Sequence, residues 1–163
     1  MNKPDNYLPV AALRMRRFLY TSITPPTWPD GIFAGSFGIE KLEEVYTLLL
    51  TCYTNGEGVL PAFDTWKEAL MNDEEFDPRL CFMLYNNGVL TGIAQCWASG
   101  FIKDFAIHPR SRNRGLGKLL LLYVFYSFKQ RGLPFVDLKV YENNLPAINL
   151  YSKSGMQVVE RIV

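Results

Sequence analysis

The segment 101–131 constrains the fold of this chain most, because three different local patterns follow one another within it. Phe101–Ile107 is rich in aromatic and branched residues, which is typical of a β-strand. His108–Arg114 is a polar turn that contains one proline and three arginines. Gly115–Arg131 is largely apolar and is followed by Gly132, which predicts a helix that ends at the glycine. A strand, a basic turn and a helix therefore succeed one another directly.

This succession provides the physical elements of an anion site. The N–H groups in the first turn of a helix have no partners within the helix, and the helix dipole makes that end partly positive. Gly115 and Gly117 leave room for a phosphate to approach those N–H groups. Arg112, Arg114 and Lys118 add full positive charges around the same point. A phosphate or pyrophosphate is the expected ligand, and a purely structural turn is the alternative that fits the same pattern.

The spacing of the glycines excludes two common phosphate-binding loops. A P-loop would require glycine at position 112 and serine or threonine at position 119, where the chain has Arg112 and Leu119. A dinucleotide-binding fingerprint would require a third glycine at position 120, which is Leu120. The remaining pattern is arginine, two residues, glycine, one residue, glycine.

That pattern, Arg112-x-x-Gly115-x-Gly117 after Ile107-His108-Pro109, resembles the acetyl-CoA pyrophosphate loop of the GNAT acyltransferase superfamily. A second stretch, Asn144-x-x-Ala147-x-x-x-Tyr151-x-x-x-Gly155-Met156, resembles the second signature of the same superfamily. The two stretches occur in the expected order and cover about the last third of the chain. The resemblance implies an acetyl-CoA-dependent N-acetyltransferase.

The expected fold is an α/β (α+β) arrangement in which a mixed, mostly antiparallel sheet is flanked by helices. The resemblance implies that the strands at 101–107 and 135–141 run parallel and splay apart, which exposes backbone groups to the pantetheine arm of the coenzyme. Hydrophobic spacing predicts further strands at 31–37, 80–85, 89–98 and 156–163, and helices at 39–53, after Asp64, and at 144–154. Residues 31–163 are expected to form the acyltransferase domain, and residues 1–30 an extension or arm.

The resemblance also implies a set of coenzyme contacts. The residues expected to bind acetyl-CoA are Phe105, Ala106, Ile107, Arg112, Asn113, Arg114, Gly115, Leu116, Gly117, Lys118, Asn144, Ala147 and Tyr151. The strand residues would act through backbone groups that pair with the pantetheine amides, and the loop would act mainly through N–H groups that hold the pyrophosphate.

Tyr151 is the predicted general acid. A phenol has an ordinary pKa near 10, so it is protonated at neutral pH and can donate a proton to a leaving thiolate. A tyrosine on an amphipathic helix can equally be a core residue. The spacing of Tyr151 from Asn144 and Ala147 favours the catalytic interpretation.

The general base is not evident from the sequence. Related enzymes often carry a glutamate on one of the two splayed strands, but the corresponding positions here are Lys103 and Lys139. Asp104 is the nearest carboxylate, although strand alternation predicts that it faces away from Lys103 and Phe105. Asp137 is the next candidate, and a chain of water molecules is the alternative.

Lys103 and Lys139 are the predicted acceptor-binding residues, because both strands should flank the acceptor mouth. Two lysines there would favour an anionic or zwitterionic amine, such as an amino acid or an acidic peptide. The alternative is that both lysines are surface residues whose charged ends reach water.

Composition limits the other classes of function. The 163 residues suit one domain, and a net charge of +1 gives no argument for binding nucleic acid or an anionic membrane. Three scattered cysteines and a single histidine predict core thiols in a reducing compartment and no metal site. The longest apolar run, Leu119–Tyr126, is too short to span a bilayer. We therefore expect a cytoplasmic protein that binds acetyl-CoA and an amine, as a monomer or homodimer; a non-catalytic acyl-CoA-binding module is the alternative.

Overall fold

The computed structural model describes residues 9–35, 37–53 and 59–163. Within these residues it contains seven strands and four α-helices. In chain order they are β1 (Ala12–Phe18), β2 (Ile32–Gly35), α1 (Leu42–Cys52), α2 (Phe63–Met71), β3 (Phe76–Asn86), β4 (Val89–Trp97), β5 (Phe101–Ile107), α3 (Leu116–Gln130), β6 (Phe135–Tyr141), α4 (Leu145–Lys153) and β7 (Gln157–Ile162). Short 3-10 turns, Ile39–Lys41 and Pro109–Ser111, precede α1 and α3.

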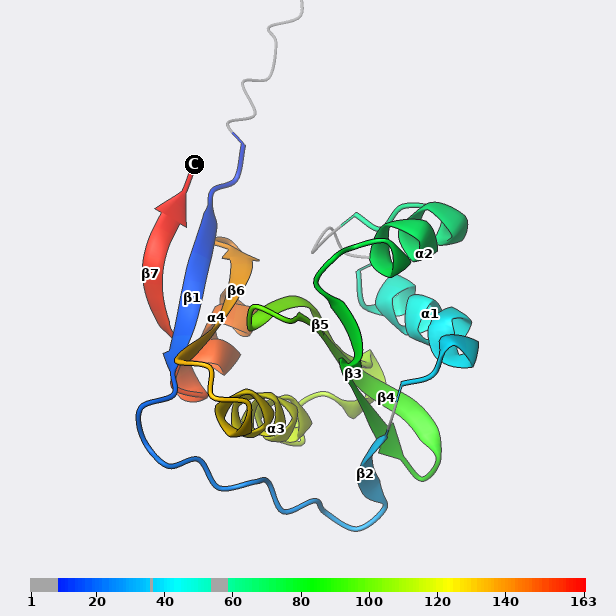
Figure 1. The fold of residues 1–163 in the computed structure, drawn as a ribbon, viewed down its shortest axis with the longest axis horizontal. Helices are drawn as coiled ribbons and strands as arrows, with labels where there is room; N and C mark the ends of the chain where they lie inside the picture. The colour runs from blue at the N-terminus through cyan, green and yellow to red at the C-terminus, as the bar shows by residue number, and fades with distance from the viewer. Residues whose placement is uncertain (1–8, 36, 54–58) are drawn as a thin grey trace, which may run out of the picture.

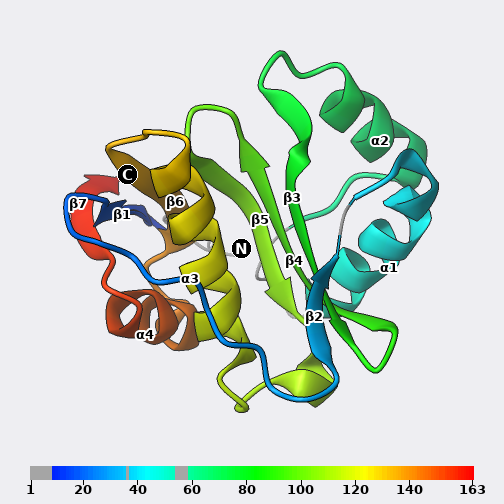
Figure 2. The same cartoon turned by 60° about the horizontal axis from the view of Figure 1, so that its bottom comes forward.

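All seven strands form one sheet in the order β2-β3-β4-β5-β6-β1-β7. Neighbouring strands are antiparallel, except that β5 and β6 are parallel. Helices α1 and α2 cover one face of the sheet, and α3 and α4 cover the other (Figures 1 and 2). The predicted mixed, mostly antiparallel sheet flanked by helices is confirmed.

Strand β1 belongs to the segment that we expected to form an extension. It pairs along its whole length with β6 and also with β7, and Met15 at its centre is fully buried. The linker that follows β1 runs along the outer side of α3 before it reaches β2 (Figures 1 and 2), where Trp28 packs edge-on against Tyr123. Residues 1–8 of the expected extension lie outside the described residues, and the boundary at residue 31 stays a prediction.

Two hydrophobic cores lie on opposite faces of the sheet. Buried residues of α3, among them Leu120, Leu121 and Phe125, pack with β5, β6 and Tyr151 on one face. Buried residues of α1 and α2, including Leu49 and Trp66, pack with β3 and β4 on the other.

Helix α2 begins at Phe63, preceded by Ala62 and Pro61, so the expected start after Asp64 is wrong by a few residues. Asp64 lies in the first turn instead, where its charge complements the helix dipole.

Strands β5 and β6 separate soon after they begin. Their parallel register contains the pairs Phe101↔Asp137 and Ile102↔Leu138, and no pair beyond them. Both strands continue for several residues past this point. The predicted splaying of these two strands is confirmed, and it leaves one edge of β5 unpaired from Lys103 onward.

Candidate active site

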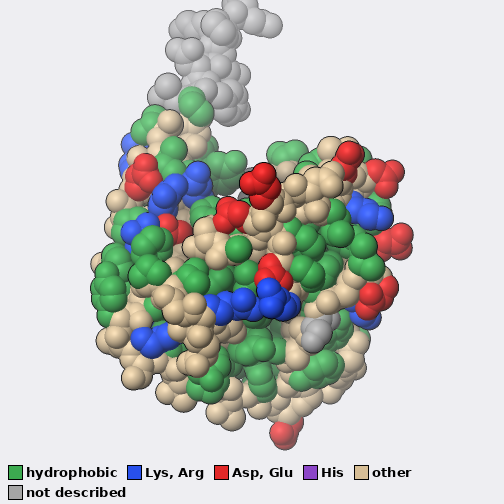
Figure 3. Space-filling view, viewed as in Figure 1, with side chains coloured by type: hydrophobic (Ala, Val, Ile, Leu, Met, Phe, Trp, Pro, Cys, Tyr) green, Lys and Arg blue, Asp and Glu red, His purple; other side chains and the backbone are tan. Residues whose placement is uncertain are grey.

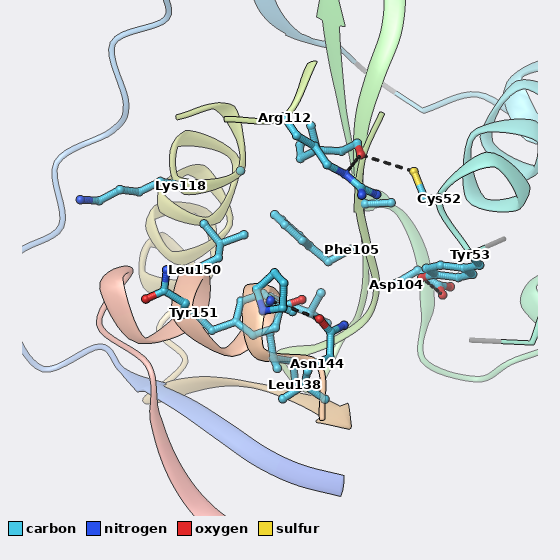
Figure 4. A pocket seen from close by; sticks show the side chains of 18 of the residues that line it. Cys52, Tyr53, Asp104, Phe105, Arg112, Lys118, Leu138, Asn144, Leu150 and Tyr151 are labelled. Carbon is cyan, nitrogen blue, oxygen red and sulfur yellow. Dashed lines mark hydrogen bonds between the residues drawn. The ribbon is translucent and has the colours of Figure 1, made fainter. Parts of the chain in front are cut away.

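A cavity of about 720 Å³ occupies the gap between β5 and β6 (Figure 4). Its lining comes from β5, the loop before α3, the first turn of α3, β6 and α4, with Cys52 and Tyr53 from the end of α1. Most of the residues predicted from the sequence line it: Lys103, Asp104, Phe105, Ala106, Ile107, Arg112, Asn113, Gly115, Leu116, Gly117, Lys118, Lys139, Asn144, Ala147 and Tyr151. Of the predicted residues, Arg114 and Asp137 are not part of the lining.

The free edge of β5 presents backbone groups to this cavity. The N–H of His108 donates to Thr91 O on β4 at 2.7 Å, so alternate residues of β5 direct their backbone groups away from β4. Ile107 is one of these, and its carbonyl accepts a hydrogen bond from Arg112 Nε at 2.9 Å and lies 3.5 Å from Cys52 Sγ. The backbone groups of Phe105 and Ile107 therefore face the gap, as a ligand running along β5 requires.

The loop between β5 and α3 winds tightly before the helix begins. Asn113 and Gly115 have positive φ angles of 61° and 77°, and Gly115 is the residue at the N-cap of α3. A side chain added at Gly115 would meet no atom within 4 Å, so its surroundings are open. At Gly117 an added Cβ would lie 3.1 Å from Leu150 on α4, so this glycine also allows the two helices to approach. The loop leaves the N–H groups of the first helical turn accessible to an anion.

Asn144 explains part of the second sequence pattern in structural terms. It is the N-cap of α4, and its side-chain oxygen accepts a hydrogen bond from the N–H of Ala147 at 3.3 Å. The three-residue spacing between Asn144 and Ala147 is the spacing of this cap. The cap fixes the asparagine at the cavity wall, with its amide nitrogen remaining as a donor.

Tyr151 lies inside the cavity on the α3 side of the sheet. It is 8% exposed, and its ring meets the ring of Phe105 edge-on at a centroid distance of 6.0 Å. Helix α4 directs it toward the gap, and Phe105 on β5 lies against it (Figure 4). Tyr151 therefore lies where α4 and the free edge of β5 meet in the cavity.

A β-bulge at Lys103 puts Ile102 and Asp104 on opposite faces of the sheet. The register between β4 and β5 shifts between Gln95↔Asp104 and Cys96↔Ile102, which leaves Lys103 as an additional residue. Ile102 therefore packs on the α3 side, whereas Asp104 faces α1. Simple alternation, which placed Lys103 on the same face as Phe105, is wrong here because the bulge interrupts it.

Asp104 has partners on both of its carboxylate oxygens. Tyr53 Oη donates to Oδ1 at 2.9 Å, and Lys103 Nζ lies 3.0 Å from Oδ2. Burial and the Asp104 charge raise the pKa of Tyr53 far above its ordinary value, so its phenol stays protonated. Tyr53 is not identifiable as a site residue from the sequence, because it lies 51 positions from Asp104 and belongs to no short motif.

Asp137, the other candidate base, is held in an ion pair. Arg16 on β1 donates to both of its oxygens, at 2.7 and 2.8 Å, and the guanidinium lies 3.5 Å from the centre of the Phe135 ring. The hydrogen bond to Asp137 raises the pKa of Arg16. Asp137 thus helps to hold β1 against β6, next to the point where β5 and β6 separate.

The two predicted acceptor lysines have different surroundings. Lys103 is bound to Asp104, and its Nζ lies 5.8 Å from the Trp97 ring. Lys139 is exposed on β6 opposite Arg14, which in turn lies 3.3 Å from Glu160. Charges of both signs are interspersed over the face shown in Figure 3.

The three cysteines of the chain are buried core thiols, as predicted. They are Cys52, Cys81 and Cys96, none of them in a disulfide, and burial raises the pKa of Cys81 to about 12. No group of three or more potential metal ligands occurs among the residues that the structure describes. Within the same residues, no helix is long and apolar enough to cross a membrane.

Comparison with known proteins identifies relatives whose names state an enzymatic activity. Residues 42–156 match the Acetyltransferase (GNAT) family. The chain is 34% identical over 74% of its length to the peptidyl-lysine N-acetyltransferase YiaC of Escherichia coli and covers 80% of that protein. It is 30% identical over 88% of its length to the mycothiol acetyltransferase of Thermomonospora curvata, about half of whose length it spans.

Solved structures agree with the sequence relatives. A GCN5-related N-acetyltransferase from Sphaerobacter thermophilus superposes with a TM-score of 0.78 at 26% identity, over 94% of this chain and 50% of that one. The ribosomal-protein-S18-alanine N-acetyltransferase of Escherichia coli superposes with a TM-score of 0.62 at 24% identity, over 76% of each chain, which supports the fold.

Proposed function

This chain belongs to the acetyltransferase (GNAT) family, and we propose that it transfers an acetyl group from acetyl-CoA to an amine of a small molecule or peptide. The observation that carries this proposal is the cavity at the splayed strands, where the free edge of β5, the loop before α3 and Tyr151 meet. A thioester bound there would lie between Tyr151 on one side and Asp104 on the other.

The coenzyme would be held mainly by backbone groups. We assign its pyrophosphate to the N–H groups of the loop and the first turn of α3, from Arg112 to Lys118. Its pantetheine arm would pair with the free edge of β5 at Phe105 and Ile107, and Asn144 would donate to it from the cap of α4. Arg114 lies outside the cavity lining and would act through its charge alone.

The chemistry requires a neutral amine and a proton for the leaving thiolate. In our proposal the acceptor ammonium gives one proton to the Asp104 carboxylate. The amine nitrogen then attacks the thioester carbonyl, and the carbon–sulfur bond breaks. Tyr151 donates its phenolic proton to the thiolate and recovers a proton from the nitrogen of the new amide. The products are the N-acetyl amine, free coenzyme A and one proton released from Asp104.

We prefer Asp104 to Asp137 as the base on physical grounds. Asp104 lines the cavity, and its two hydrogen bonds use part of its acceptor capacity and leave sites for an ammonium group. Asp137 accepts both hydrogen bonds of a bidentate arginine and lies outside the lining, so a proton taken there would disrupt that pair. The catalytic role of Asp137 stays a prediction, as does the water chain.

We also propose an acceptor class, a cellular compartment and an oligomeric state. The named relatives act on peptidyl-lysine and on a small molecule, and we propose an acceptor of one of these kinds. Buried thiols suit a cytoplasmic location. We propose that the chain acts as a monomer or homodimer, with acetyl-CoA and the amine as its ligands, and without nucleic acid, membrane or metal.

The test combines binding with turnover. Calorimetry measures acetyl-CoA binding, and thiol release measures turnover over amino acids, polyamines, aminoglycosides, N-terminal peptides and lysine peptides. We expect binding, and thiol release with at least one acceptor class. Binding without release on any amine would favour the non-catalytic acyl-CoA-binding module, for which the lysines at the usual glutamate positions are the supporting observation. Absence of acetyl-CoA binding would contradict both.

A further inference from the structure

Tyr53 lies at the end of helix α1, on the side of β5 opposite Tyr151, and its hydroxyl reaches the carboxylate of Asp104 (Figure 4). We infer that Tyr53 is a positioning residue for the acceptor amine: it fixes the orientation of Asp104, the carboxylate that takes the proton of the acceptor ammonium. The inference rests on the proposed function and adds to it a residue from outside both sequence signatures.

The end of α1 is attached to β5 at two points. The backbone N–H of Tyr53 continues the helical hydrogen bonding to Leu49 O at 2.9 Å, so its ring leaves the helix in a defined direction. Its neighbour Cys52 places its sulfur 3.5 Å from the carbonyl of Ile107, and Tyr53 reaches Asp104 three residues earlier on the same strand. The last residue of α1 and its C-cap residue therefore set the distance between this helix and the free edge of β5.

The hydrogen bond has a defined direction. Because the pKa of Tyr53 is raised by burial and by Asp104, the phenol remains a donor over the working pH range. Tyr53 and Lys103 each occupy one oxygen of the carboxylate, which fixes its rotation. Each oxygen keeps a further acceptor site, and Asp104 lines the cavity, so an ammonium can bind there.

Tyr53 should therefore determine how well Asp104 receives the acceptor ammonium. In Tyr53→Phe the donor to Oδ1 is lost, and the carboxylate can rotate about its remaining contact with Lys103. Proton transfer needs the ammonium and a carboxylate oxygen within hydrogen-bond reach of each other, so turnover of the acceptor should slow.

The experiment measures kcat and KM for the best acceptor, at saturating acetyl-CoA, for the wild type and Tyr53→Phe. We expect kcat/KM for the acceptor to fall by about tenfold, as the loss of a hydrogen bond to a charged group implies. The KM for acetyl-CoA should stay within about twofold, since Tyr53 lies away from the coenzyme loop. An unchanged kcat/KM for the acceptor overturns the inference.

Tyr46→Phe is the matched control. Tyr46 lies on the same helix, but its hydroxyl donates to the carbonyl of Pro61 at 2.7 Å. Its removal should leave kcat/KM for the acceptor within about twofold of the wild type, and thermal unfolding of both variants measures any general loss of stability. An equal loss in Tyr46→Phe would mean that Tyr53 acts by supporting the helix, and would overturn the inference.

A double variant tests whether Tyr53 acts through Asp104. Asp104→Asn removes the charge and keeps the shape, and adding Tyr53→Phe to it should change turnover by less than about twofold. Independent, multiplying losses would overturn the inference and leave the acetyltransferase proposal standing. Binding of acetyl-CoA by the wild type without turnover on any amine would instead overturn the proposed activity, and this inference with it.

Discussion

The two sides of strand β5 are built in different ways. On the α3 side, the candidate coenzyme site comes from the loop before α3, the first turn of α3 and helix α4, and its loop presents mostly backbone N–H groups and glycines. On the α1 side, the candidate acceptor site comes from Asp104 and from Tyr53, which are 51 positions apart and meet through side chains. A ligand shared by a whole family can be held by backbone geometry, whereas an acceptor that differs between members needs side chains that can vary.

The largest expected effect tests the chemistry on the α3 side. Tyr151→Phe keeps the edge-on ring packing against Phe105 and removes the hydroxyl alone. If Tyr151 protonates the thiolate, turnover should fall by roughly 10²- to 10⁴-fold, with acetyl-CoA affinity little changed. Thiol-release kinetics and calorimetry measure the two quantities. Tyr126→Phe on α3, outside the cavity lining, is the control, and full turnover in Tyr151→Phe would make Tyr151 a core residue.

The next largest effect tests whether backbone N–H groups on the α3 side bind the phosphates of acetyl-CoA. Gly117→Val should reduce acetyl-CoA affinity by roughly 100-fold, because its side chain would keep phosphate from charge-assisted hydrogen bonds. An added Cβ also lies 3.1 Å from Leu150, so packing alone could be responsible. The double variant Gly117→Val with Leu150→Ala separates the causes: it relieves the packing and leaves the phosphate blocked. Recovery of affinity in the double variant would contradict the loop assignment.

The sequence predicted the α3 side well because its determinants are local. Phe101–Ile107 and Phe135–Tyr141 have the predicted bounds, and α3 begins one residue after the predicted Gly115. The bulge at Lys103 was not predicted, since it arises from the register of β5 against β4. Strand β1 was missed for the same reason: its pairing with β6 and β7 joins segments more than 100 residues apart.

A smaller effect is expected at Arg112, whose side chain both bonds a backbone carbonyl and carries a positive charge. Its Nε bonds the carbonyl of Ile107, so its positive charge is held beside the loop. Arg112→Ala should weaken acetyl-CoA binding by roughly 10-fold, with the loss decreasing at high salt, because it removes a charge near phosphate and a backbone partner. Arg110→Ala removes an equal charge two residues away, outside the cavity lining, and should have little effect. Equal losses in both variants would show that the loop acts through net charge alone.

The smallest effect concerns acceptor choice. Lys103 is already bound to Asp104, so Lys139 is the lysine whose charge should influence the approach of an acceptor. Lys139 is exposed, and the field of an exposed charge is screened within about 10 Å at 0.1 M salt. Lys139→Glu should therefore shift the ratio of kcat/KM for an acidic over a basic amine by only about two- to fivefold, and high salt should abolish the shift. Lys67→Glu on α2 makes the same change of net charge away from the cavity. If it shifts the ratio equally, or if the wild type prefers a polyamine, then the acceptor is selected by the paired Asp104 and Tyr53 rather than by lysines at the mouth.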